Sequence, residues 1–147
     1  MNEQMEATVK LVNQKIRLTG SSRNNPVITM DYFPPYGDGD GYTGLELLLV
    51  SLGGCSSTAI VFLLRKMSKT VSDFRVNLKG IRREQAPLSF KEIYIEFILE
   101  SDNTKDAELQ KAIQISEESF CPVWAMIKNS VIIKTNFKII SKAEVKN

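Results

Sequence analysis

The sequence predicts a single α+β domain spanning residues 1–147. Two bulk observations support a globular domain, namely a hydrophobic fraction of 43% and a charged fraction of 24% in a chain of 147 residues. The order of the periodic segments predicts the class. Strand patterns occur in runs, three before the first helical pattern and two after it, and there is no regular alternation of strand and helix. Because no repeat, low-complexity tract or linker interrupts these patterns, one domain is expected.

Three short strands are predicted at the N-terminal end, over residues 6–12, 15–20 and 26–31. In the first, apolar and polar residues alternate with a period of two, which is typical of a half-buried strand. Turn-forming residues separate the strands. Residues 32–42 contain two adjacent prolines and three glycines and therefore predict an irregular loop.

A long helix is predicted after this loop. Thr43 and Glu46 have the spacing of a capping box, in which a threonine and a glutamate three residues later cap each other's backbone N–H groups. The apolar pattern continues to about Met67 and ends among basic residues, which suit a helix C-terminus. Such a helix, apolar on most faces, is normally buried. Interruptions by glycine, serine and threonine argue against a membrane span.

The second half of the chain predicts two strands, two helices and a final strand. The strands cover residues 74–80 and 92–99, the helices residues 105–120 and 122–128, and the last strand residues 131–140. Pro122 separates the two helices, because proline is disfavoured inside a helix and favoured at its first position. The predicted order is therefore βββ-α-ββ-αα-β.

Charge and composition exclude several classes of function. The net charge of +2, from 19 basic and 17 acidic residues, is too balanced to indicate nucleic acid or an anionic membrane as a partner. The chain contains no histidine, which excludes Ser-His-Asp and Cys-His catalysis and any histidine-ligated metal. Two cysteines cannot complete a structural zinc site, so no metal or cofactor is expected. The first residues do not form a signal peptide, and the expected location is the cytoplasm.

The two cysteines are the strongest candidates for chemistry, because a cytoplasmic chain rarely uses them for a structural disulfide. Cys55 follows two glycines inside the predicted long helix, where each glycine costs about 1 kcal/mol relative to alanine. The glycines admit either a close backbone or a ligand. Alternatively, Cys55 is an inert core residue and the glycines only allow tight helix crossing. Cys121 precedes Pro122 at a predicted helix N-terminus, which lowers a thiol pKa. Its alternative role is that of a plain cap in place of serine.

The charged candidates also have simple structural roles as alternatives to a role in catalysis. Glu46 fits a role limited to the capping box, although a capping carboxylate can also accept a hydrogen bond from a guanidinium. Each arginine, Arg17 included, can be a solvated surface charge.

These residues together resemble the OsmC/Ohr family of peroxide-metabolising proteins. The similar segments are residues 44–49, 53–55 and 120–123, with sequences GLELLL, GGC and FCPV. The family places an acidic or amide residue nine or ten positions before a helical cysteine, and Glu46 lies nine positions before Cys55. A second cysteine follows in a Cys-Pro step, here Cys121. The order of elements is also similar over nearly the whole chain.

The resemblance implies an α+β fold in which antiparallel sheets wrap around the long helix of an intertwined homodimer. It further implies a thiol peroxidase that reduces organic hydroperoxides. Cys55 would attack the peroxide and become a sulfenic acid, and Cys121 would resolve it as a disulfide. An external dithiol, such as a lipoyl protein or thioredoxin, would reduce that disulfide. Arg17 would hold Cys55 as a thiolate, and Glu46 would orient Arg17.

Two other functions fit the same residues. One is a non-catalytic protein that binds a small hydrophobic ligand in the dimer cleft, and the other is a structural dimer with two inert thiols. An ordered guanidinium at Cys55 would favour the peroxidase, and a neutral apolar surround would favour the binding protein.

Overall fold

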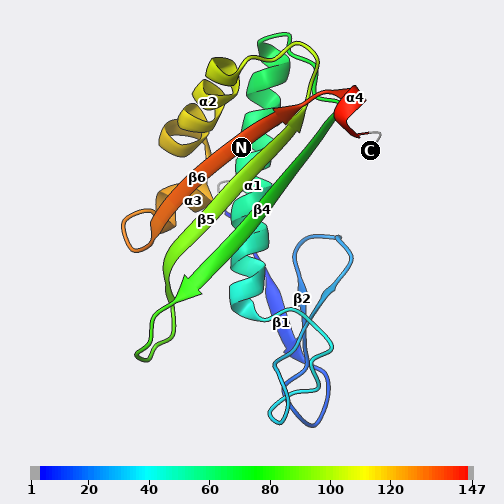
Figure 1. The fold of residues 1–147 in the computed structure, drawn as a ribbon. Coiled ribbons are helices and arrows are strands. Elements are labelled where there is room, and N and C mark those ends of the chain that lie inside the picture. The colour runs from blue at the N-terminus through cyan, green and yellow to red at the C-terminus, as the bar shows by residue number, and fades with distance from the viewer. Residues whose placement is uncertain (1–3, 146–147) are drawn as a thin grey trace. The chain divides into compact units, whose positions relative to one another are not determined.

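The computed structural model describes residues 4–145 and shows two compact units, which divide between Leu48 and Leu49. Each unit is described by itself, and a single domain over residues 1–147 stays a prediction. Figure 1 shows the elements. Their order confirms the predicted α+β class and the predicted succession βββ-α-ββ-αα-β, to which the structure adds a π-helical turn and a short C-terminal helix.

The first unit contains a three-stranded antiparallel sheet in the order β1-β2-β3. The strands are β1 (Thr8–Leu11), β2 (Leu18–Ser21) and β3 (Ile28–Met30). All three predicted strands are present, but β2 begins three residues later than expected. The cause is the Asn13 side chain, whose oxygen accepts the backbone N–H groups of Lys15 and Arg17, at 3.0 Å each, and holds them in a turn.

Helix α1 (Gly44–Lys66) begins with the predicted capping box. The Thr43 backbone N–H donates to the Glu46 carboxylate at 2.8 Å, and the Glu46 N–H donates to the Thr43 hydroxyl at 3.2 Å. Helix α1 is long and apolar enough by composition to cross a membrane, and 33% of its most apolar stretch, its inner side chains, is buried. The largest of them are Leu52, Ile60, Leu63 and Leu64.

The sheet of the second unit has the order β4-β5-β6 and is mixed. Strand β4 (Asp73–Arg82) is antiparallel to β5 (Phe90–Glu100), whereas β6 (Ile132–Ile140) is parallel to β5. The expected antiparallel pairing is therefore present between β4 and β5, whereas β6 departs from it. The helical segments between β5 and β6 return the chain to the end of the sheet at which β5 begins, and such a crossover produces a parallel pair.

This crossover consists of α2 (Asp106–Ile115), the π-helical turn η1 (Ser116–Phe120) and α3 (Pro122–Ile127). Where one helix was expected over residues 105–120, the last turn widens to π geometry. The Cys121 N–H donates to the Ser116 carbonyl at 2.8 Å, an i to i−5 hydrogen bond that replaces the usual i to i−4 bond. A short helix, α4 (Lys142–Val145), follows β6 and was not predicted.

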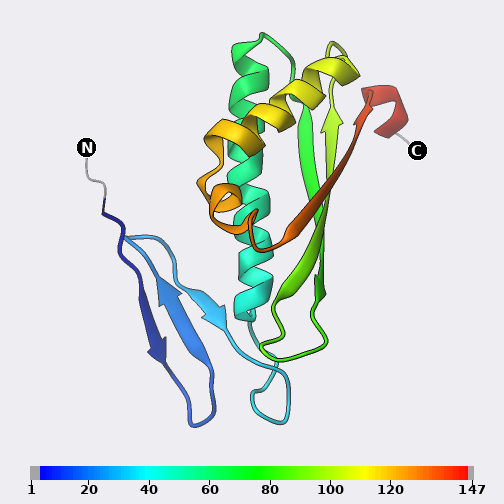
Figure 2. The same ribbon diagram turned by 90° about the vertical axis from the view of Figure 1, so that its left-hand side faces the viewer.

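Helices α1 and α2 lie on one face of the second sheet (Figure 2). Alternate β5 side chains facing the helices are almost completely buried, namely Ile93, Ile95, Phe97 and Leu99. Helix α1 approaches β4 closely at Gly53, where an added Cβ would lie 2.7 Å from Leu78 Cδ1. A larger residue at position 53 would therefore displace the Leu78 side chain, so Gly53 allows α1 to pack closely on β4.

Candidate thiol site

Cys55 lies in the middle of α1 and is half-buried. The two glycines before it differ in their surroundings. Gly53 is in contact with Leu78, as described above, whereas a Cβ added to Gly54 would meet no atom of the described chain within 4 Å. The close neighbour at Gly53 is thus a side chain of this chain's own sheet, and neither a backbone nor a ligand. The space beside Gly54 is open.

Cys121 occupies the N-cap position of α3, as predicted, and is only 2% exposed. Its sulfur accepts a hydrogen bond from the Trp124 backbone N–H, with 3.4 Å between the sulfur and the nitrogen. The hydroxyl of Ser56, on α1, lies 3.7 Å from the same sulfur. Cys121 is therefore held between the start of α3 and the middle of α1.

The two thiols are neighbours, and both are free in this structure. Burial raises the pKa of the Cys55 thiol, a hydrogen bond from the Val123 backbone N–H lowers it, and a hydrogen bond to the Cys121 side chain raises it again. The net shift of the Cys55 pKa is upward. The shift is upward because burial outweighs the single N–H donor, so the described residues by themselves do not favour the Cys55 thiolate that the family resemblance implies.

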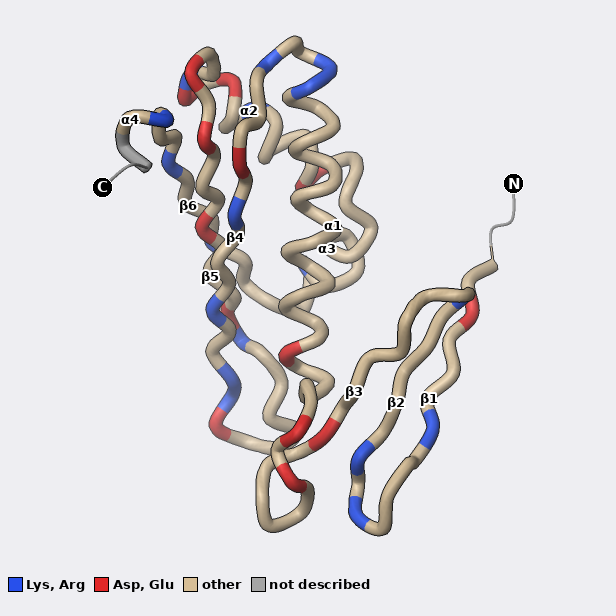
Figure 3. Tube along the Cα trace, turned by 90° about the vertical axis from the view of Figure 1, so that its right-hand side faces the viewer, with Lys and Arg blue, Asp and Glu red and all other residues tan. Residues whose placement is uncertain are grey.

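No charged residue lies on α1 between Glu46 and Arg65, as Figure 3 makes visible along the helix. The helix itself therefore supplies no charge to stabilise a Cys55 thiolate. The arrangement is nevertheless suited to disulfide chemistry. Two free thiols from positions 55 and 121 lie near each other, one of them half-buried and the other buried.

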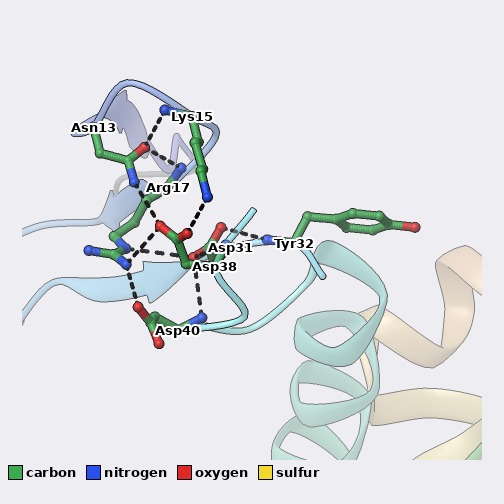
Figure 4. A network of polar contacts seen from close by, with 7 residues as sticks. All are labelled: Asn13, Lys15, Arg17, Asp31, Tyr32, Asp38 and Asp40. Carbon is green, nitrogen blue, oxygen red and sulfur yellow. Dashed lines mark hydrogen bonds and ion pairs between the residues drawn. The ribbon is translucent and has the colours of Figure 1, made fainter. Parts of the chain in front are cut away.

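Arg17 lies in the first unit, in a network of polar side chains drawn in Figure 4. Its guanidinium forms ion pairs with Asp31 at 3.6 Å, with Asp38 at 3.3 Å and with Asp40. Lys15 adds a further ion pair to Asp38 at 2.6 Å. The network fastens the β1–β2 turn to the loop that precedes α1.

Asp31 is the buried member of this network, with a fully buried side chain. Burial raises the pKa of its carboxyl, but three backbone N–H donors, from Tyr32, Asp40 and Asp38, together with the Arg17 guanidinium, lower that pKa below its ordinary value. Carboxylate oxygens of Asp31, Asp38 and Asp40 lie within 4.8 Å of one another. Three carboxylates could in principle hold a cation, but Arg17 and Lys15 already neutralise most of their charge.

The predicted pairing of Glu46 with Arg17 is not among the ion pairs of residues 4–145. The Glu46 carboxylate is used in the capping box, and three aspartates bind the guanidinium in its place. The structure thus supports the plain alternative for Glu46. Because Arg17 and Cys55 belong to different units, a role for Arg17 at the thiol stays a prediction.

Sequence reasoning missed Ser56, Trp124 as a donor and the three aspartates. A serine beside a cysteine inside a helix carries no distinctive pattern, and the Trp124 donor is a backbone group whose direction follows from the start of α3. The aspartates could have been suspected from the run of acids in the loop over residues 31–40.

Comparison with known proteins identifies the family. A family model described as "OsmC-like protein" matches residues 37–136, which is more than half of the chain. The chain belongs to the OsmC-like family. This OsmC-like protein is similar to Protein YhfA of Escherichia coli strain K12, with 33% identity over 138 residues that cover 93% of this chain and 99% of that protein. The resemblance found in the sequence is thereby confirmed.

Solved structures show the same fold. A hypothetical protein from Aquifex aeolicus VF5 has a TM-score of 0.83 and 29% identity, covering 96% of this chain and 99% of that chain. An OsmC-like protein from Mycoplasma pneumoniae has a TM-score of 0.78 and 21% identity, with the same coverage. A more distant structure is titled an organic hydroperoxide resistance protein, from Elizabethkingia anophelis. It has a TM-score of 0.71 and 14% identity, covers 95% of this chain and 99% of that chain, and supports the fold alone.

Proposed function

We propose that this OsmC-like protein is a thiol-dependent peroxidase that reduces organic hydroperoxides. The observation that carries the proposal is the proximity of Cys55 and Cys121, which come from distant parts of the sequence and lie close enough for Cys121 to influence the pKa of Cys55. Two adjacent thiols of unequal exposure are what a peroxidatic and a resolving cysteine require. Organic hydroperoxides are proposed as the substrate class because the Elizabethkingia anophelis neighbour is named an organic hydroperoxide resistance protein.

The proposed reaction has three steps. The Cys55 thiolate attacks the distal oxygen of the hydroperoxide, the O–O bond breaks, and the alkoxide leaves and takes up a proton as an alcohol. Cys121 then attacks the Cys55 sulfenic acid, a disulfide forms, and water is released. Finally an external dithiol reduces the disulfide and is itself oxidised. Burial of the site among apolar groups favours bulky organic hydroperoxides over hydrogen peroxide.

The raised pKa of Cys55 limits the first step, because less of the thiol is present as the attacking thiolate. A guanidinium beside the sulfur would counteract burial, and Arg17 is our candidate for that role. Arg17 could stabilise the thiolate only with the part of its positive charge that the three aspartates bound to it do not neutralise. Glu46 would act only indirectly, through the start of α1.

The active form is proposed to be a homodimer in the cytoplasm, reduced by a lipoyl protein or thioredoxin. The support for a dimer is the outer surface of α1, where Val50 and Phe62 are each 58% exposed and Gly54 faces open space. A second copy of the helix would cover these apolar groups. Light scattering at micromolar concentration should give twice the mass of the chain, and a monomer would contradict the proposal.

A second function is favoured by one observation, the upward shift of the Cys55 pKa. A neutral thiol in an apolar surround suits a non-catalytic protein that binds a small hydrophobic ligand in the dimer cleft. This protein would not consume hydroperoxide, and its thiols would stay reduced during exposure to it.

One experiment separates the two functions. The reduced protein receives one equivalent of cumene hydroperoxide, and its intact mass is measured. The peroxidase predicts loss of two hydrogen atoms within one chain, and reversal of this loss by a dithiol. Cys121→Ser should still react once but then advance to irreversible sulfinic acid at Cys55. Unchanged thiols in the wild-type protein, or disulfides formed only between chains, would contradict the proposed mechanism and favour the binding protein.

A further inference from the structure

We propose that Ser56 is a positioning residue for Cys121. Together with the Trp124 backbone N–H, its hydroxyl holds the Cys121 sulfur as the leaving thiolate when the Cys55–Cys121 disulfide is reduced. The inference rests on the proposed function in so far as that function forms this disulfide. It adds a direction to the reductive step, in which the external thiol attacks Cys55 and Cys121 departs.

The geometry at Cys121 provides two donors from different elements. Ser56 is fully buried on α1, with its hydroxyl oxygen 3.7 Å from the Cys121 sulfur. The Trp124 nitrogen, in the first turn of α3, lies 3.4 Å from the same sulfur. Hydrogen bonds to a charged acceptor are stronger than those between neutral groups, so both contacts strengthen when the sulfur becomes a thiolate.

Ser56 behaves differently from the two hydroxyl residues that follow it. The hydroxyls of Ser57 and Thr58 donate back to their own helix, to the carbonyls of Gly53 at 2.6 Å and Gly54 at 2.9 Å. The Ser56 hydroxyl instead reaches across to Cys121. A thiolate has no proton to give, so in that state the serine must be the donor.

Exposure decides which sulfur the reductant attacks. Cys55 is half-buried, whereas Cys121, at the start of α3, is 2% exposed. A thiolate of the reductant therefore attacks the Cys55 sulfur. The new bond joins the reductant to Cys55, the Cys55–Cys121 bond breaks, and its electron pair goes to the Cys121 sulfur.

The second thiol of the reductant completes the step. It attacks the mixed disulfide, closes the oxidised dithiol and releases Cys55, and the two protons of the dithiol pass to the two protein thiolates. A leaving thiolate departs faster when it is better stabilised. Removal of the Ser56 hydroxyl should therefore slow the reductive step without changing the attack of Cys55 on a hydroperoxide.

The test starts from protein oxidised with diamide, an azo compound that accepts two electrons and two protons from a thiol pair. The rate of reduction by dithiothreitol is then measured. We expect Ser56→Ala to slow reduction about tenfold, the factor that corresponds to about 1.4 kcal/mol. Ser57→Ala, which removes the neighbouring hydroxyl, is the matched control and should leave the rate unchanged. Ser56→Thr keeps a hydroxyl at the position and should recover most of the wild-type rate.

Two further measurements exclude a merely structural effect. The burst rate of Cys55 oxidation by cumene hydroperoxide should be equal in wild-type protein and Ser56→Ala. Brief treatment of the oxidised protein with mercaptoethanol, followed by acid quenching and peptide mapping, should place the mixed disulfide on Cys55. Equal reduction rates for Ser56→Ala and wild type, or an adduct on Cys121, would overturn the proposal.

The outcomes distinguish this proposal from the proposed function. If diamide forms the disulfide and cumene hydroperoxide does not, the peroxidase proposal fails while the reduction rates still decide the role of Ser56. If neither oxidant forms the disulfide within one chain, both proposals fail.

Discussion

Oxidation of the thiol pair should stabilise the second unit of this protein. Cys55 and Cys121 are 66 positions apart (121 minus 55), so their disulfide closes a long loop in the unfolded chain. The chain-entropy relation for a loop of this length gives a stabilisation of about 4 kcal/mol, as an upper limit for an unstrained bond. Because Cys121 lies close enough to Cys55 to influence its pKa in the reduced fold, we expect the bond to form with little distortion.

Urea denaturation of reduced and diamide-oxidised protein measures this effect. With a denaturant dependence of about 2 kcal/mol per molar urea, the midpoint should rise by up to about 2 M on oxidation. Cys121→Ser should show no rise, since it lacks the partner thiol. A midpoint for the oxidised protein at or below that of the reduced protein would refute the reasoning, because it would mean that the native fold must be distorted to bring the sulfurs into bonding geometry.

Three further predictions concern groups whose environments the structure defines. The alkylation rate of Cys55 should keep rising with pH beyond the ordinary thiol pKa of about 8.5, because burial raises the pKa of this thiol; a plateau below that pH would contradict the upward shift. Asp31→Asn should lower the urea midpoint at neutral pH, and the difference from wild type should shrink as pH falls below about 4. The reason is that the pKa of Asp31 is lower in the folded than in the unfolded chain. The carboxylate therefore stabilises the fold above the unfolded-state pKa, and this stability is lost as pH falls through the folded-state pKa. A constant difference between pH 6 and 3 would exclude this carboxylate as the cause. Thr43→Ala should lower the free energy of unfolding by about 1 kcal/mol, because α1 loses its N-terminal cap, and Glu46→Ala should lower it by a similar amount. If Glu46→Ala instead lowered only the reaction rate of Cys55, the role of Glu46 would lie at the thiol.

Helix α1 supplies no charged group that could activate the Cys55 thiol. In the described residues the thiol has one N–H donor, from Val123, and a second thiol beside it. Because α1 carries no charge between Glu46 and Arg65, a charge that activates Cys55 would have to come from another segment or from the second copy in the proposed dimer.

Local sequence patterns determined most of the secondary structure of this protein. The capping box at Thr43 and Glu46 set the start of α1, and period-two alternation located the strands, because both depend on neighbours within a few residues. The family could also be inferred from the sequence, since the glycines and Cys55 keep their spacing to Glu46. Likewise, Pro122 marked the break before α3, because proline cannot continue the helix that precedes it.

Only the tertiary structure decided the features that depend on long-range contacts. The parallel pairing of β6 follows from the path of the crossover, and the partners of Arg17 follow from the folding of a loop more than ten residues away. The pKa of Cys55 is likewise set by what surrounds it and not by its neighbours in sequence. Burial opposes the charged form, and one backbone donor is too little to offset it. Ser56 acquires its partner only because α1 and the start of α3 pack together, a contact between residues 65 positions apart.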